Sequence, residues 1–241
     1  TDMYIKRLAL IASLAMALAS CQDSFKIEGN TSITQLEGSK LYLKVFDGTG
    51  MASIDSCEVH HGAFSFKGYR DSIEMALISY KDEMLMPVVL DATTINVNMA
   101  DGEHKASGSA LNDSLFRFID AKSKIDHALA ELPNRLSQMI MDGADIDEVQ
   151  PMLAMEAERI KNDGDRAIID FIKKNINNPI GSGMFMLATT DNDYPTLTPG
   201  VEEILTDAGH SFRNNLYVKK YIEIAEENML LLREGKQPRH M

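Results

Sequence analysis

The sequence is poor in the residues that redox, metal and nucleic-acid chemistry depend on. Its 241 residues include two cysteines, Cys21 and Cys57, and no C-x-x-C pair, which excludes a dithiol redox centre. Tryptophan is absent, so the most effective stacking platform for sugars and bases is missing. The formal net charge is −12, from 36 acidic and 24 basic side chains. This balance argues against nucleic acid as a partner.

A hydrophobic run long enough to span a membrane is also lacking near the start of the chain. A basic pair at 6–7 precedes an apolar stretch over 8–18, and two small residues follow before Cys21. This arrangement is typical of a secretory signal peptide, whereas a spanning helix needs roughly 20 apolar residues. We therefore expect a signal peptide over 1–20, cleaved between Ser20 and Cys21.

The residues around this cleavage point resemble the bacterial lipobox. In Leu18-Ala19-Ser20-Cys21 the cysteine occupies the position that receives a diacylglycerol and becomes the mature N-terminus. The resemblance implies a palmitate-bearing lipoprotein of a Gram-negative cell envelope. Cys21 would anchor it to the outer or inner membrane, with its body in the periplasm or at the cell surface. Each buried CH₂ contributes about 0.8 kcal/mol, so several acyl chains hold a domain firmly. The alternative is a signal peptide with a coincidental cysteine.

Residues 21–108 are expected to form an antiparallel β domain, a sandwich or a barrel-like sheet. Apolar and polar residues alternate over 40–46, and further strand-like segments follow at close spacing. A hairpin is predicted with its turn at His60-His61-Gly62. The expected strands beyond 40–46 are 53–59, 63–68, 73–80, 84–90 and 95–99.

Residues 109–232 are expected to form a helical domain, followed by a polar tail over 233–241. Apolar residues recur there at three- and four-residue steps, as on one face of an amphipathic helix. Pro179 after Asn178, and Pro199 after Thr198, are typical of helix starts. The chain is thus predicted to be α+β, with its division near 108–111. The apolar stripes run over 111–132, 146–160 and 167–172, and a last helix over 217–232.

The order of these parts resembles a family of bacterial lipoproteins. The pattern Ile-Asp-Ser-x-x-Val…Gly-x-Phe-x-Phe-x-Gly over 54–68 is similar to that of a β module, itself a domain of unknown function. In that family the module often precedes a thioredoxin-like domain of the thiol–disulfide oxidoreductase or peroxiredoxin-like kind. Residues 171–175, 178–179 and 184–185 resemble the family's later helical segment.

The family's redox activity does not transfer to this chain. The sequence ends at Met241, where the thioredoxin-like domain would begin, and no residue matches its catalytic cysteines. The resemblance instead implies an envelope module that assists, positions or has lost a redox domain. We expect a non-catalytic interaction module that binds an envelope protein, first of all a thioredoxin-fold protein, and that uses no cofactor.

Two other functions remain open from the sequence. The polar loop over 189–195 is the candidate rim of a site for a glycan or a peptide. An enzyme acting through the Cys57 thiol is less expected, because Asp55 and Glu58 flank it and disfavour the thiolate. The candidate rim residues are Thr190, Asp191, Asn192, Asp193 and Tyr194.

No metal is expected to bind. Cys57, His60 and His61 form the one Cys/His cluster, and a metal site wants three or four ligands. The acidic stretches 142–148 and 162–165 lack the ligand spacing of a calcium loop. We interpret both as turns between helices, with acids that cap helix N-termini.

Methionine is abundant, with 15 residues. Methionine-rich surfaces can repack around varied partners, but filling of the core is the default expectation for those on the helical stripes. These are Met139, Met141, Met152, Met155, Met184, Met186 and Met229.

Overall fold

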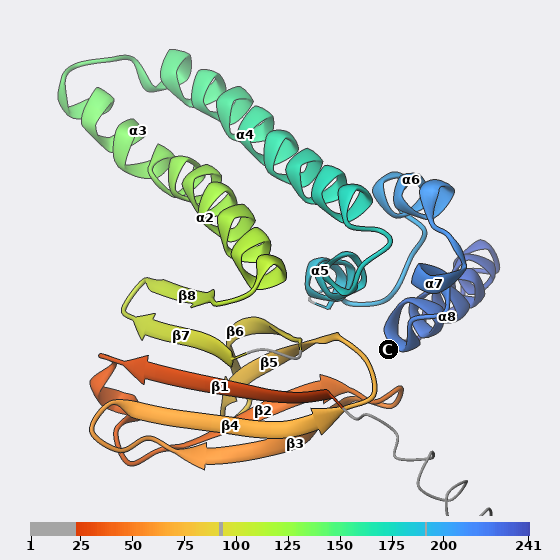
Figure 1. The fold of residues 1–241 in the computed structure, drawn as a ribbon. Helices are drawn as coiled ribbons and strands as arrows, with labels where there is room; N and C mark the ends of the chain where they lie inside the picture. Colours follow the sequence, from red (N-terminus) through yellow and green to blue (C-terminus); the bar gives the residue numbers. More distant parts are fainter. Residues whose placement is uncertain (1–22, 92–93, 191) are drawn as a thin grey trace, which may run out of the picture.

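The computed structural model describes residues 23–91, 94–190 and 192–241, so Ser20 and Cys21 lie outside the described residues. Two four-stranded sheets, ordered β4-β1-β7-β8 and β3-β2-β5-β6, form the N-terminal part, and helices follow (Figure 1). The expected α+β class is confirmed. The strands are β1 (Asp23–Thr31), β2 (Lys40–Phe46), β3 (Met51–Glu58), β4 (Ala63–Arg70), β5 (Glu74–Tyr80), β6 (Glu83–Leu90), β7 (Thr94–Ala100) and β8 (Glu103–Ser107).

Burial along the strands shows which faces are covered. β2 and β7 alternate buried and more exposed residues, because one face of each lies on the core and the other toward solvent. β5 is buried at five successive positions from Met75 to Ser79. Helix α5 (Pro179–Thr189) contacts β5. Gly183 lies so close to Met75 that a Cβ added at Gly183 would come within 2.5 Å of its sulfur.

The predicted hairpin at His60-His61-Gly62 is wrong in its pairing, although its turn forms. His60 and Ala63 make an isolated bridge across the turn, with His61 and Gly62 at positive φ. Beyond it, β3 pairs with β2 and β4 pairs with β1, so the two strands enter different sheets. The turn is a local property of the chain, whereas the choice of partner strand depends on which sheet buries each apolar face.

One strand pair is parallel in a fold expected to be antiparallel. β1, which no local pattern predicts as a separate strand, pairs in parallel with β7, with Ile27 opposite Ile95. Both residues are fully buried. The other strand pairs are antiparallel among the described residues. The fold is therefore rich in antiparallel pairs rather than purely antiparallel.

A buried asparagine joins the sheet to the first long helix. β8 ends at Ser107 and α2 (Ala110–Ala130) begins after Ser109, whose hydroxyl caps the helix by accepting from the Asn112 backbone N–H. The Asn112 carboxamide is fully buried. Its oxygen accepts from the Val89 N–H and its nitrogen donates to the Val89 carbonyl, both at 2.9 Å. The side chain thus takes the place of a further strand beside the edge strand β6.

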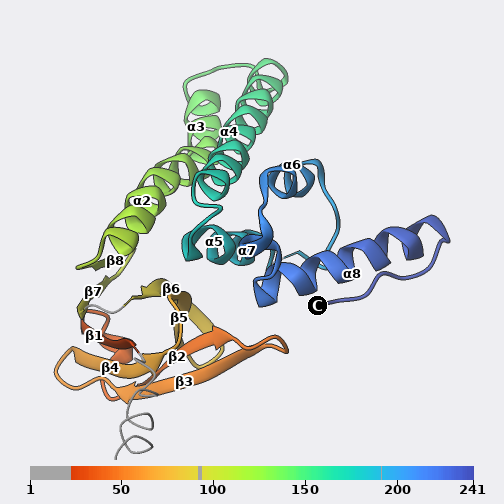
Figure 2. The same ribbon diagram turned by 45° about the vertical axis from the view of Figure 1, so that its right-hand side comes forward.

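Helices α2, α3 (Leu132–Met141) and α4 (Ile146–Lys174) form an arm that projects from the sheets (Figures 1 and 2). The interpretation of 142–148 as a capped turn is confirmed, because Asp145 caps α4. The interpretation of 162–165 as a turn is wrong, because these residues lie inside α4. Gly164 is buried there, and a Cβ added to it would lie 3.4 Å from Lys122 of α2. Gly164 therefore lies where α4 contacts α2 and does not break the helix.

The remaining helices pack on the β domain and share its core. Asn178 and Thr198 cap α5 and α6 (Pro199–Asp207), as predicted. α7 (His210–Arg213) and α8 (Leu216–Arg233) follow. One continuous cluster of buried side chains runs from both sheets into these helices. In the part of the chain that is described, no helix has the length and apolarity needed to cross a membrane.

Candidate functional site

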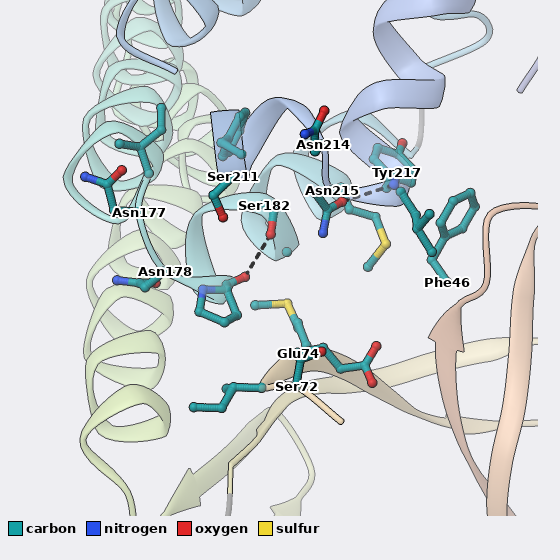
Figure 3. Close-up of a pocket in the computed structure, with 18 residues that line it drawn as sticks. Phe46, Ser72, Glu74, Asn177, Asn178, Ser182, Ser211, Asn214, Asn215 and Tyr217 are labelled. Atoms are coloured by element: carbon teal, nitrogen blue, oxygen red, sulfur yellow. Dashed lines mark hydrogen bonds between the residues drawn. The ribbon is translucent and has the colours of Figure 1, made fainter. Parts of the chain in front are cut away.

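A cleft of about 390 Å³ lies where the β domain meets the helices (Figure 3). One wall comes from the β domain, from the end of β2, the start of β5 and the residues that precede β5. The opposite wall comes from the starts of α5 and α8 and from α7. Four separate chain segments therefore build it. Concave sites of this size between packed units are the usual places for small ligands.

The polar lining of the cleft is made of neutral side chains. The two asparagines that cap helices already accept a hydrogen bond through their side-chain oxygens. Asn178 accepts from the Ile180 N–H, and Asn215 accepts from the Tyr217 N–H. The amide nitrogen of Asn215 and the exposed side chain of Asn177 make no hydrogen bond among the described residues. The neutral polar lining consists of Asn177, Asn178, Asn214, Asn215, Ser72, Ser182 and Ser211.

Apolar side chains form the deeper lining and part of the rim. Ile73 is 44% exposed and Leu216 is 57% exposed, on opposite walls. Phe46 and Tyr217 meet edge to face, with ring centroids 5.1 Å apart. Since Tyr217 is buried and its ring abuts Phe46, neither wall offers a broad aromatic face to a ligand.

Charge is sparse in the cleft. Glu74 is its one carboxylate among the described lining residues, and it is paired with Arg70. No lysine or arginine of the described chain lines the cleft. An anionic ligand would therefore find no cationic partner there.

The predicted rim over 189–195 belongs to a smaller neighbouring cavity. Thr190 and Asn192 line a cavity of about 190 Å³ that also contacts Phe46 and Tyr217. Tyr194 does not line it, and the backbone carbonyl of Asp193 contacts the His240 ring. Asp191 lies outside the described residues. A ligand role for this loop stays a prediction.

The loop is held by the tyrosines of α8. The Tyr221 hydroxyl donates to the Thr196 carbonyl at 3.0 Å, and the Tyr217 hydroxyl lies 3.0 Å from the Thr189 hydroxyl. Burial raises the pKa of Tyr221. These bonds fix the loop against the helix, which gives the polar sequence a structural role.

The end of the arm carries an exposed apolar surface. Met141 is 80% exposed and Met155 is 74% exposed, so core filling is the wrong expectation for them. Met184 and Met186, in α5, are buried as expected. We call the exposed apolar side chains at the end of the arm the arm tip: Ile140, Met141, Ile146, Met152 and Met155.

Cys57 lies in β3 and is partly buried. Burial, with a smaller contribution from the Asp55 carboxylate, raises the pKa of the thiol to about 11. A reactive cysteine needs the opposite shift.

The turn beside Cys57 is held by a carboxylate. Gly62 and His61 donate their backbone N–H groups to Glu37, which lowers the pKa of that carboxyl.

No group of three or more His, Cys, Asp or Glu side chains is arranged to hold a metal in the described part of the chain. Cys57 is a free thiol in this structure. The Cys57, His60 and His61 cluster therefore does not gain the further ligands that a metal would need.

The sequence does not predict the cleft, although it carries one local signal for it. Asn177-Asn178 and Asn214-Asn215 each stand directly before a helix. An asparagine pair at a helix start leaves one carboxamide to cap the helix and one to face outward. The sequence does not say that the two pairs lie on one wall.

Comparison with known proteins gives one match to a family model, in the N-terminal part. Residues 25–115 match the model of the family described as "Domain of unknown function (DUF4369)", from β1 into the start of α2 and including Asn112. No curated protein and no solved structure matches the chain.

Proposed function

We propose, for a chain whose N-terminal domain matches a family of unknown function, that it is a lipid-anchored envelope protein acting as a non-catalytic interaction module. Its contact surface is the arm tip, and its partner is an envelope protein, first of all one with a thioredoxin fold. The observation that carries the proposal is the presentation of large apolar side chains at the far end of a projecting helical arm. Several large apolar side chains exposed on one part of a protein favour a protein–protein contact site there.

The arm tip has the composition of an adaptable surface. Methionine side chains are flexible and polarisable, so they adjust to the shape of a partner. The surrounding segment 131–163 carries eight acidic and three basic side chains. A groove with an apolar floor and a basic rim is the complementary partner surface, since charges at a rim steer association and select partners.

The start of β1, which follows the expected anchor in sequence, lies away from the arm tip. β1 begins at Asp23, two residues after Cys21. Figures 1 and 2 both place the start of β1 away from the end of the arm. A lipid on Cys21 would hold the β domain near the membrane surface and direct the arm toward proteins in the surrounding compartment.

The test is cross-linking and capture of the lipidated protein from its native cells. We expect a thioredoxin-fold protein to be recovered, and the double variant Met141→Glu/Met155→Glu to reduce that recovery at least tenfold. The matched control is Met84→Glu, since Met84 is 49% exposed on the β domain. Equal recovery by the arm variant and the control would contradict a contact through the arm tip. A Cys21→Ala variant that stays with the membrane fraction would contradict the anchor.

The thiol-based alternative is disfavoured by the high pKa of Cys57. We expect a Cys57→Ser variant to be unchanged in any peroxidase or reductase assay. Loss of such an activity in this variant would show that the protein is an enzyme and would contradict the proposal of a non-catalytic module.

A further inference from the structure

We propose that the cleft between the β domain and helices α5 and α8 binds an extended, uncharged peptide segment with aliphatic side chains. The cleft and the arm tip are separate surfaces, so this binding does not depend on the arm. Its volume of about 390 Å³ suits a short segment of chain rather than a folded domain.

The sheet opens at the cleft. The pairing of β2 with β5 ends at Lys44 opposite Leu77, although β2 continues to Phe46 and β5 begins at Glu74. At its first residues β5 therefore has a strand neighbour on one side only, β6, with Glu74 opposite Leu90. An extended peptide commonly binds such an open strand through its backbone groups.

The facing wall supplies groups that match a peptide backbone. A carboxamide both donates and accepts a hydrogen bond, as a peptide group does. Asn177 brings such a group, and the Ser211 hydroxyl can both donate and accept. The Asn215 oxygen already caps α8, so this side chain adds its amide nitrogen as a donor. The Ser182 hydroxyl donates to the Pro179 carbonyl and can still accept. Figure 3 shows Asn178, Ser182 and Asn215 across the cleft from Ser72 and Glu74.

The apolar lining favours aliphatic side chains over a sugar ring. Ile73 and Leu216 stand exposed on opposite walls, where a partner side chain would bury them. Phe46 and Tyr217 use their rings against each other, so no flat aromatic platform is left for a sugar. Leucine, valine or isoleucine at alternate positions of an extended peptide would lie on one face and contact this lining.

The charge of the cleft excludes the common ionic ligands. The single lining carboxylate, Glu74, is already paired with Arg70, and no lysine or arginine of the described chain lines the cleft. A phosphate or a free carboxylate would lose its hydration without gaining an opposite charge. A neutral internal segment of a polypeptide carries no such cost.

The test uses methionine-methyl NMR on the protein labelled at its methionine methyl groups. Met75 and Met186 line the cleft, whereas Met141 and Met155 lie on the arm tip. The probe is a pool of acetylated, amidated tetrapeptides with leucine, valine or isoleucine at positions one and three and serine or alanine at two and four. We expect saturable shifts of Met75 and Met186 alone, with a Kd on the order of 10 μM to 1 mM.

Matched variants locate the site. Asn177→Trp places a large ring at the mouth of the cleft and should weaken binding at least tenfold, which is about 1.4 kcal/mol. Ser211→Trp tests the same prediction from α7, should the first variant fail to fold. Asn134→Trp changes an exposed asparagine of the arm and should leave binding unchanged. The variant Met141→Glu/Met155→Glu should also bind the pool normally, which separates this proposal from the contact through the arm tip.

Three outcomes would overturn the proposal. The first is the absence of a saturable shift at Met75 and Met186. The second is equal binding of a pool with aspartate at positions one and three, since the cleft has no cation for it. The third is a shift of the same methyl groups by a neutral disaccharide and not by the peptides, which would assign the cleft to sugars.

Discussion

The body of the molecule and its arm use apolar side chains in opposite ways. In the body, one continuous core joins both sheets to α5, α6, α7 and α8. The arm has a separate small core of four buried residues, Leu132, Val149, Leu153 and Ile160. Large apolar side chains of the arm, such as Met141, face solvent. The body therefore holds the larger core, whereas the arm exposes part of its apolar surface.

The difference extends to how each region resists local opening. A segment with few buried apolar contacts opens at a low free energy, whereas a shared core opens only with the whole domain. Beyond its own small core, the arm is fastened near its base, where Phe118 of α2 stacks on Phe171 of α4 with centroids 4.0 Å apart. We expect opening to begin at the arm tip and to stop near this aromatic pair.

The largest expected effect is that of Phe185→Ala in the body. Phe185 is fully buried and its ring contacts those of Phe212, Tyr217 and Tyr221. Removing it leaves a cavity among these rings, which should lower the free energy of unfolding by about 3–5 kcal/mol. Chemical denaturation followed by circular dichroism measures the loss. A loss below about 1 kcal/mol would contradict a single core that includes α5 and α8.

The next effect is that of Asn112→Leu, which tests how the body is joined to the arm. Leucine has a similar size but leaves the Val89 N–H without a partner, and the Val89 carbonyl keeps only its bond from the Asp91 N–H. We expect a loss of about 2–4 kcal/mol, because the orphaned N–H costs about 1–3 kcal/mol and the lost bond to the carbonyl about 1 kcal/mol. The control Asn134→Leu changes an exposed asparagine of the arm. If both variants unfold alike in denaturant, the edge of β6 does not need the carboxamide.

A change within the arm core should act locally. Leu153→Ala removes one of four buried side chains there, and we expect the free energy of arm opening to fall by about 2–3 kcal/mol. Amide hydrogen exchange should become faster in α3 and in the first half of α4. Exchange in β2, β5 and α5 should stay as in the parent. Faster exchange in the body as well would mean that arm and body unfold as one unit.

Elements with strong local signals could be predicted from the sequence. Alternation over 40–46 gave the bounds of β2, and the proline after Asn178 or Thr198 marked a helix start. In each case the cause acts within a few residues, through the side-chain period of a strand or through a cap. The turn at His60-His61-Gly62 was predicted for the same reason.

Features that depend on distant partners were not predictable in this way. The strands on either side of that turn separate into two sheets, and β1 pairs in parallel with β7. Gly164 has the sequence appearance of a turn, yet it marks the contact of α4 with α2. The cleft was missed because its walls come from β5, α5 and α8, and no local pattern states that these segments meet. The 189–195 loop, by contrast, is predicted as the rim of a ligand site because its polar residues are adjacent in sequence.

The smallest expected effect is at the contact between the base of the arm and the body. Arg166 and Lys173 of α4 donate to Glu203 of α6 at 2.7–2.8 Å and hold the pKa of that carboxyl down at about 2. A carboxyl whose pKa is lowered on folding stabilises the folded state above its ordinary pKa near 4.5, and that stabilisation is lost as the pH falls toward 2. Glu203→Gln should therefore reduce the acid dependence of the thermal midpoint between pH 4.5 and 2. The exposed control Glu226→Gln, in α8, should leave it unchanged. The same slope in Glu203→Gln and the parent would show that this ion cluster does not fasten the arm to the body.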